Sequence, residues 1–217
     1  MGIYERCVLP HLIQAAMRQE RLVPYRERLI AAAEGRVLEI GFGSGLNLPF
    51  YTKVTRLVGL DSSPALLSAA RDTARKTMFP VELLEGSAEA IPLEDGSVDV
   101  VVTTWTICSI SDVPRALQEV RRVLTPSGRL LFVEHGLSPD AAVVRWQHRL
   151  TPVWRRIAGG CHLDRPVSQL IEGSGFRIEQ LQTGYMKGPR VMTFMYEGSA
   201  SPAKRSAPPP KPNARSL

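Results

Sequence analysis

The chain has 217 residues, of which 44% are hydrophobic and 22% are charged, and its formal net charge is +6. This length suits one well-packed α/β domain and is short for two. There is no run of about 18 apolar residues and no signal-peptide core, so we expect no membrane-spanning helix and predict a cytoplasmic protein.

Three cysteines, Cys7, Cys108 and Cys161, are odd in number and far apart in the chain. This argues against a disulfide framework and for reduced thiols. Four basic residues and no acidic ones lie in residues 199–217, which leaves the rest of the chain a net charge of only +2. We therefore predict no nucleic-acid partner.

The N-terminal part of the chain, residues 8–32, has the pattern of helices, with interruptions expected near Pro10 and Pro24. We predict that residues 1–34 form a helical flap over a ligand site.

From Arg36 onward, apolar runs rich in Val, Ile and Leu alternate with helical patterns. Buried parallel strands read as near-continuous apolar runs of this kind. We expect five such strands, at residues 36–40, 56–60, 81–84, 98–103 and 129–134.

Helices are predicted between these strands, from about Leu46, over 63–76 and over 113–123. Ser62 or Ser63 can cap the second of these helices and Asp112 the third, each with a proline in the first turn.

After Glu134 the pattern changes. A helix is expected over 165–173, and the runs at 176–182 and 190–197 look like a hairpin. The sequence thus predicts one doubly wound, mostly parallel seven-stranded sheet that spans residues 35–198 and is closed by an antiparallel C-terminal hairpin. Residues 199–217, rich in Pro, Ser and basic side chains, have little to bury, and we predict that they form a disordered tail.

The most informative segment is the glycine cluster Gly41, Gly43 and Gly45, which ends the first apolar run. Glycines there let a bulky ligand approach the main chain. Asp61 ends the next run, where a carboxylate can accept hydrogen bonds from both hydroxyls of a ribose. Glu39 either anchors the glycine loop or faces a cationic amine. Together these residues predict a nucleoside-containing cofactor.

With these residues assembled, the chain resembles the class I S-adenosylmethionine-dependent methyltransferases. Three further segments, 85–93, 95–102 and 120–128, resemble that family's third loop, fourth strand and fifth-strand turn. Many members have Asp where Ser87 stands, so the adenine contact falls here to Ser87 or to the backbone of Ala88. The resemblance implies S-adenosylmethionine as cofactor, S-adenosylhomocysteine as product, and cofactor contacts from Glu39, Gly41, Gly43, Gly45, Asp61, Ser62, Ser87, Ala88 and Thr103.

Within the family, the chain is most similar to the small alkyl thiol methyltransferases, with quinone and phospholipid methyltransferases as neighbouring groups. The matching pieces are residues 107–110, Glu134-His135, Trp146-Gln147 and 159–163. This similarity implies methyl transfer to a small lipophilic acceptor, with a thiol as one candidate. A membrane-surface phospholipid or quinone methyltransferase and a non-catalytic cofactor-binding protein are the alternatives.

Acceptor residues are expected after the fourth and fifth strands, because ligands of open α/β sheets bind at the carboxyl ends of the strands. His135 is the candidate base that would remove the acceptor's proton. His162, with Cys161 and Asp164, is expected to form a second polar cluster. No four ligands have usable metal-site spacing, so no metal is predicted. The candidate substrate-binding residues are Trp105, Cys108, Trp154, Cys161 and His162.

Residues 141–158 mix apolar side chains with four arginines, and Pro152 is expected to interrupt any single helix there. Such a segment can lie on a membrane surface, which makes peripheral membrane contact a candidate interaction. Nothing in the sequence distinguishes a monomer from a dimer.

Overall fold

The computed structural model describes Tyr4 and residues 8–203. Within these residues the strands are β1 (Glu34–Ile40), β2 (Lys53–Asp61), β3 (Val81–Glu85), β4 (Val98–Thr104), β5 (Leu124–His135), β6 (Phe176–Tyr185) and β7 (Phe194–Pro202). They form one sheet in the order β3-β2-β1-β4-β5-β7-β6. The pairs among β1 to β5 are parallel, whereas β7 runs antiparallel to both β5 and β6. The predicted sheet and its closing hairpin are confirmed.

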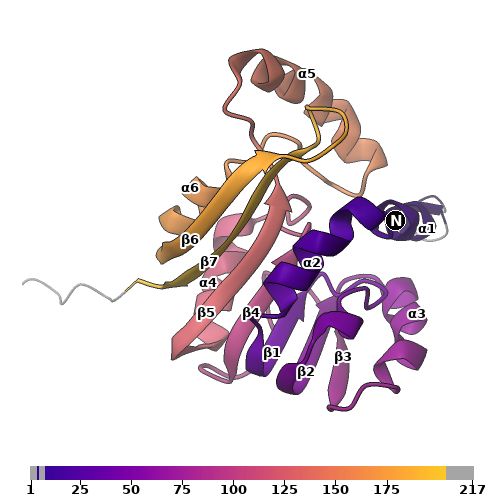
Figure 1. Cartoon of the computed structure of the whole chain (residues 1–217), viewed down its shortest axis with the longest axis vertical. Coiled ribbons are helices and arrows are strands. Elements are labelled where there is room, and N and C mark those ends of the chain that lie inside the picture. Colours follow the sequence, from indigo (N-terminus) through magenta and orange to yellow (C-terminus); the bar gives the residue numbers. More distant parts are fainter. Residues whose placement is uncertain (1–3, 5–7, 204–217) are drawn as a thin grey trace, which may run out of the picture.

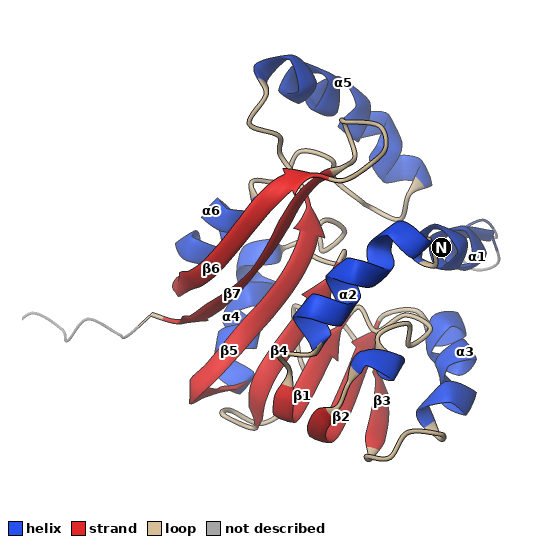
Figure 2. Ribbon diagram, viewed as in Figure 1, coloured by secondary structure: helices blue, strands red, loops and turns tan. Residues whose placement is uncertain are grey.

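The α-helices are α1 (Leu9–Met17), α2 (Val23–Ile30), α3 (Pro64–Ala74), α4 (Val113–Val123), α5 (Ala141–Ile157) and α6 (Val167–Gly173). Helices cover both faces of the sheet, and α5 lies beyond the carboxyl ends of the parallel strands (Figures 1 and 2). No helix in the described part of the chain combines the length and apolar character that crossing a bilayer needs.

The core has two layers, one on each face of the sheet. On one face, α2 and α3 contribute Leu29, Ile30 and Leu67, which pack against the strands. On the other face, α4 and α6 contribute Leu117 and Ile171. The helices and the buried apolar residues of the strands hold the sheet rigid, and its carboxyl edge becomes a fixed platform for loops.

Both predicted helix caps form. The Ser63 hydroxyl accepts a hydrogen bond from the Leu66 N–H, and the Asp112 carboxylate accepts one from the Arg115 N–H at 3.0 Å. Each satisfies an N–H that the first turn leaves unpaired. Pro10 and Pro24 stand in the first turns of α1 and α2, so they begin helices rather than break them.

The helix expected from about Leu46 is absent. A single 3₁₀ turn, Leu48–Phe50, is found there instead. β2 begins at Lys53, three residues earlier than the apolar run indicates, because Lys53 already pairs with Glu34 of β1.

Pro152 does not interrupt α5, which is continuous from Ala141 to Ile157. Proline removes one backbone hydrogen bond, to the carbonyl four residues earlier. That carbonyl belongs to His148. The neighbouring Thr151 hydroxyl donates to the Gln147 carbonyl at 2.7 Å and adds a bond at the same turn.

Residues 199–202, predicted as part of the tail, belong to β7. β7 continues to Pro202, and its residues Ser199 and Ala200 pair with Leu131 and Leu130 of β5. Pairing with the buried strand β5 therefore decides the structure of residues 199–202, although their polar composition predicts a tail. Residues 204–217 lie outside the described residues, and the division of the chain into flap, domain and tail stays a prediction.

Candidate active site

The glycine turn after β1 leaves open space over its middle residue. Gly41, Gly43 and Gly45 all have positive φ. A Cβ on Gly41 would lie 2.1 Å from the Thr106 hydroxyl, and one on Gly45 would lie 2.7 Å from Leu48. A Cβ on Gly43 would meet only the Gly41 carbonyl oxygen, at 3.9 Å. Gly41 and Gly45 therefore let Thr106 and Leu48 pack directly against the backbone of the turn. Gly43 leaves bare backbone that a ligand can approach.

Asp61 faces this turn from the end of β2. Its carboxylate accepts hydrogen bonds from the Gly43 N–H at 2.7 Å and from the Ser63 N–H at 2.8 Å. Burial raises the pKa of Asp61, and the N–H groups of Ser63, Gly43 and Ser62 oppose that rise. An ionised carboxylate has about four acceptor positions. At least one therefore remains for a ligand hydroxyl, so the turn and Asp61 fit the ribose end of an adenosyl group.

Glu39 anchors the glycine loop, the first of its two predicted roles. It is buried, and its two oxygens accept hydrogen bonds from Asn47 and from Tyr51, each at 2.7 Å. Arg26 of α2 donates to the side-chain oxygen of Asn47. Burial raises the pKa of Glu39 to about 7, while Tyr51, Asn47 and Arg26 oppose the rise. The network ties α2 to the loop, and the sequence did not indicate Arg26, Asn47 or Tyr51 as members.

Ser87 and Ala88 follow β3, whose last residue, Glu85, pairs with Asp61. The Gly86 N–H donates to the Asp61 backbone carbonyl at 3.1 Å, and the Ser87 hydroxyl accepts from the Glu89 N–H. Thr103 lies inside β4 rather than at its end, and its buried hydroxyl has no partner among the described residues. Cofactor contacts from Ser87, Ala88 and Thr103 stay predictions.

Trp105 turns the chain sharply at the end of β4. Its φ of 52° makes it the one described non-glycine residue in the left-handed region, a conformation that is costly and often found at functional sites. Beyond it, the N–H groups of Thr106 and Ile107 donate to one oxygen of Glu134, at 2.9 and 3.1 Å. The other Glu134 oxygen is buried without a partner among the described residues.

The same turn also touches the glycine loop. The Thr106 hydroxyl donates to the Ile40 carbonyl at 3.2 Å. The Trp105 ring packs under the Arg26 guanidinium, 4.9 Å from its centroid. Residues 105–108 are therefore fixed between the cofactor cradle and the end of β5. The sequence indicates Glu134 only as part of the Glu134-His135 segment. Its burial and its bonds to the turn after β4 make it a site residue that sequence analysis missed.

Three residues that are distant in the sequence meet beyond this turn. The donor atoms of Cys108, His135 and Cys161 all lie within 4.8 Å of one another. The His135 Nε2 is 3.2 Å from the Cys161 Sγ. They come from the turn after β4, the end of β5 and the segment after α5, respectively. The structure thus brings together three of the predicted acceptor-side residues.

The electrostatics of this cluster favour a thiolate on Cys161. The Cys108 thiol donates to the Cys161 sulfur, which lowers the pKa of Cys161 and raises that of Cys108 well above its usual value. Burial lowers the pKa of His135. The hydrogen bond to Cys161 and the charges of Cys161 and Glu134 raise it by more, so the net change is upward. A thiolate paired with an imidazolium is an activated arrangement.

His162 does not join Asp164, contrary to the expected second cluster. The His162 N–H donates to the Cys108 carbonyl at 2.9 Å, and the His162 ring lies beside Arg165. Asp164 instead pairs with the exposed His148 at 2.8 Å. His162 therefore fastens the segment after α5 to the turn that carries Cys108.

Trp154 places a polar group near the same cluster. Its indole N–H, on α5, is buried and faces Cys161, whose pKa it helps to lower. This donor is available to a ligand held between α5 and the sheet.

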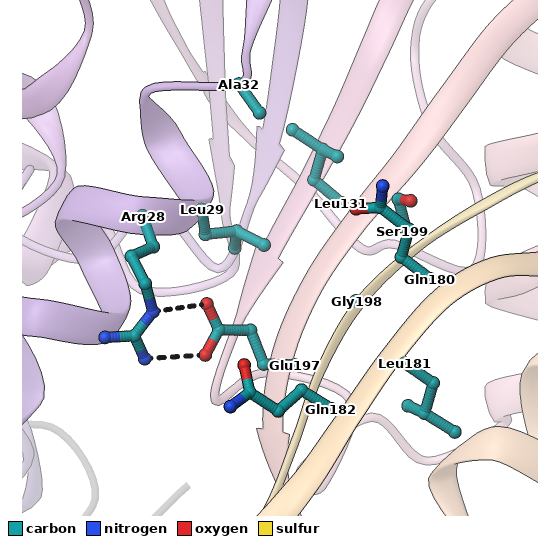
Figure 3. Close-up of a pocket in the computed structure, with 10 residues that line it drawn as sticks. All are labelled: Arg28, Leu29, Ala32, Leu131, Gln180, Leu181, Gln182, Glu197, Gly198 and Ser199. Carbon is teal, nitrogen blue, oxygen red and sulfur yellow. Dashed lines mark hydrogen bonds and ion pairs between the residues drawn. The ribbon is translucent and has the colours of Figure 1, made fainter.

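A separate hollow lies on one face of the sheet, between α2 and strands β5 to β7 (Figure 3). Its volume is about 270 Å³, and the paired Arg28 and Glu197 side chains lie at its rim. None of the predicted site residues lines it. The chemistry-bearing residues lie at the carboxyl edge instead, where ligands bind in open α/β sheets.

Comparison with known proteins agrees with this geometry. A family profile described as "Methyltransferase domain" matches residues 38–132. The thiol S-methyltransferase TMT1B of Rattus norvegicus is 35% identical over 153 residues, which cover 69% of this chain and 63% of the rat protein. This chain therefore spans less than two thirds of that relative's length.

Two further comparisons cover more of the chain. A SAM-dependent methyltransferase of Mesorhizobium loti has the same fold, with a TM-score of 0.64 at 18% identity over 85% of this chain and 99% of that one. The demethylmenaquinone methyltransferase of Deinococcus radiodurans is 30% identical over 189 residues, which cover 79% of this chain and 78% of that protein. Because this match spans more than three quarters of both proteins, the chain belongs to the class I S-adenosylmethionine-dependent methyltransferases, whose cofactor fits the cradle between β1 and β2.

Proposed function

We propose that this protein transfers the methyl group of S-adenosylmethionine to the sulfur of a small lipophilic thiol. The observation that carries the proposal is the Cys108, His135 and Cys161 cluster at the carboxyl edge of the sheet. Its member Cys108 lies two residues after Thr106, whose side chain packs against Gly41 of the glycine turn. The similarity to TMT1B supports the same class of acceptor.

In this proposal the residues of the cradle hold and orient the cofactor. Gly43 offers bare backbone, and Asp61 offers its remaining acceptor position to the ribose. The cofactor supplies an electrophilic methyl group when bound. Alignment of a nucleophile with that group contributes about 7–11 kcal/mol in well-oriented reactions.

The chain must also prepare the acceptor sulfur. A thiol with a pKa near 8.5 is only a few per cent thiolate at neutral pH. His135 and Cys161 lie in contact at the end of β5, and this pair, when it is a thiolate beside a neutral imidazole, would take the acceptor's proton. The half-buried Trp154 ring, on α5 beside Cys161, would contact the acceptor.

Methyl transfer from labelled S-adenosylmethionine tests the proposal, with alkyl thiols, phenols, amines, a phospholipid amine and a demethylated quinone as acceptors. We expect labelled thioether from lipophilic thiols. Cofactor binding without any labelled product would instead identify a non-catalytic binding protein.

A quinone methyltransferase is the second candidate. The specific observation in its favour is the demethylmenaquinone methyltransferase relative, whose match spans more of this chain than that of TMT1B. Product on the quinone and none on thiols, in the same assay, would select this alternative.

We also propose that α5 contacts a membrane surface. Trp146, Leu150, Val153 and Ile157 recur every three or four residues on α5, and each is at least 39% exposed. They form one apolar face, flanked by Arg145, Arg149, Arg155 and Arg156. This pattern suits the headgroup region of an anionic bilayer.

Sedimentation with anionic vesicles tests the membrane contact. Replacing the four flanking arginines by glutamine should reduce the bound fraction, and so should Val153→Ser. As a control, Leu181→Ser changes an exposed apolar residue of β6 and should have no effect. Equal sedimentation of all variants would reject the proposal.

A further inference from the structure

We propose that Cys108, His135 and Cys161 bind a zinc ion, and that the fourth coordination position takes the acceptor thiol. The metal site stands on the geometry of these three residues, whereas the role of the fourth position rests on the proposed thiol methyl transfer. In this arrangement His135 acts as a ligand rather than as a base.

The distances suit a tetrahedral metal. Zinc holds sulfur at about 2.3 Å and nitrogen at about 2.0–2.1 Å, so neighbouring donors of a tetrahedral site lie roughly 3.5–3.8 Å apart. The three donor atoms here lie within 4.8 Å of one another, with His135 and Cys161 at 3.2 Å. Small side-chain adjustments would bring all three to coordination distance.

The donor set selects the kind of ion. Two sulfurs and one imidazole nitrogen are soft and intermediate ligands, which favour zinc over magnesium or calcium. The combination of two Cys and one His with an open fourth position is one of the arrangements found in catalytic zinc sites. Two thiolates and an imidazole neutralise the charge of a divalent ion, which favours holding that ion in a buried place such as this one.

The surrounding backbone holds the three donors in place. On one side, the left-handed Trp105 and the Glu134 carboxylate fix the turn that carries Cys108. On the other side, Gly159 and Gly160 have positive φ and turn the chain back after α5. The Cys161 N–H then donates to the Ala158 carbonyl at 3.1 Å.

These two segments are also fastened to each other. The His162 N–H donates to the Cys108 carbonyl at 2.9 Å, and Arg165 donates to the Ile110 carbonyl. Ligands in zinc sites are generally oriented by such supporting hydrogen bonds. These contacts hold the segments of Cys108 and Cys161 together and so fix the positions of two of the three donors.

The open position gives the metal a chemical role. A thiol that coordinates there exchanges its S–H bond for a zinc–sulfur bond, and the proton passes to solvent. Metal ions lower the pKa of groups bound to them and so supply nucleophiles at neutral pH. One of the three ligands, Cys108, belongs to the turn whose Thr106 packs against Gly41, so the metal would sit on the segment that joins the two halves of the site.

The test measures metal binding directly. The full chain, kept reduced with a phosphine, is stripped of metal and titrated with zinc against a coloured chelator, and with cobalt as an absorbing substitute. We expect one ion per chain and a thiolate-to-cobalt charge-transfer band. Adding an alkyl thiol should change the cobalt spectrum. Cys108→Ser, Cys161→Ser and His135→Gln should each weaken zinc binding at least 10-fold.

His148→Gln is the matched control, because His148 is an exposed histidine that pairs with Asp164. It should bind zinc like the parent chain. Circular dichroism and calorimetry with S-adenosylmethionine show whether each variant folds and keeps its cofactor site.

The outcomes separate this inference from the proposed function. No zinc bound by the reduced parent chain, or equal binding by the three variants, overturns the metal site. Thiol methylation at an undiminished rate after metal removal overturns its role while the proposed function stands. Zinc bound by the three residues with no thiol methylated supports the site and rejects the thiol acceptor.

Discussion

The Asp61 carboxylate accepts the Gly43 N–H at 2.7 Å and so joins the end of β2 to the middle of the glycine turn. This contact fixes the carboxylate beside the open space over Gly43. Asp61 and Gly43 should therefore both be needed for cofactor binding.

Asp61→Ala should weaken S-adenosylmethionine binding by at least about 1–2 kcal/mol, the scale of lost hydrogen bonds to a charged group. Calorimetry measures the change. Asp72→Ala, an exposed acid of α3, is the control and should bind normally. If NAD bound in place of S-adenosylmethionine, the cofactor assignment would be wrong.

Gly43→Ala should impair cofactor binding more than folding. A side chain in the left-handed region costs roughly 1–2 kcal/mol, and this one would also occupy the open cradle. Gly96 has a similar φ of 62° with no atom within 4 Å of an added Cβ, so Gly96→Ala reports the backbone strain alone. We expect similar losses of stability in urea, and a loss of affinity only in Gly43→Ala. Equal affinities would place the cofactor elsewhere.

His135→Ala should lower turnover about 10²–10⁴-fold, the usual contribution of a general acid or base. Cofactor affinity should change little, because His135 lies on the acceptor side of the site. Steady-state kinetics and calorimetry separate the two effects, and His148→Gln is again the control. Unchanged turnover would remove His135 from the chemistry.

Glu39→Gln should make the stability less dependent on pH. The folded pKa of Glu39 is about 7, above the ordinary value of 4.5. The protonated Glu39 therefore adds to the free energy of unfolding below pH 4.5. This contribution, about 3 kcal/mol, is lost as the pH rises from 4.5 through 7. Glu134 has a similarly raised pKa and contributes in the same direction.

Urea unfolding between pH 5 and pH 8 measures this effect. The parent chain should lose stability over the interval, and Glu39→Gln should lose roughly half as much because the Glu134 contribution remains. Identical losses in the two proteins would show that Glu39 does not titrate in this range. Glu82→Gln, at an exposed acid of β3, serves as the reference substitution.

Much of the scaffold follows from local patterns in the sequence. The parallel strands are continuous apolar runs, and Ser63 and Asp112 are side chains that cap the next helix by themselves. These features depend on residues close together in the chain. The expected helix after Gly45 failed because the start of β2 is set by pairing with β1, which the apolar run alone does not show.

The acceptor side was less predictable because its contacts are distant in sequence. Cys108, His135 and Cys161 meet only after the sheet has formed and the segment after α5 has folded back over it. No spacing rule reveals such a cluster, and the expectation of no metal rested on spacing alone. The anchoring of Glu39 by Arg26, Asn47 and Tyr51 likewise depends on the final positions of α2 and the loop.

The position of α5 has a consequence for how acceptors arrive. One side of this helix carries Trp154 toward the sulfur cluster, and the other exposes Trp146 and Val153. If the exposed side rests in lipid, an oily acceptor could enter from the hydrocarbon phase without crossing water. Selection among acceptors would then follow their partition coefficients, and apparent KM values would fall as each compound becomes more concentrated in the vesicles.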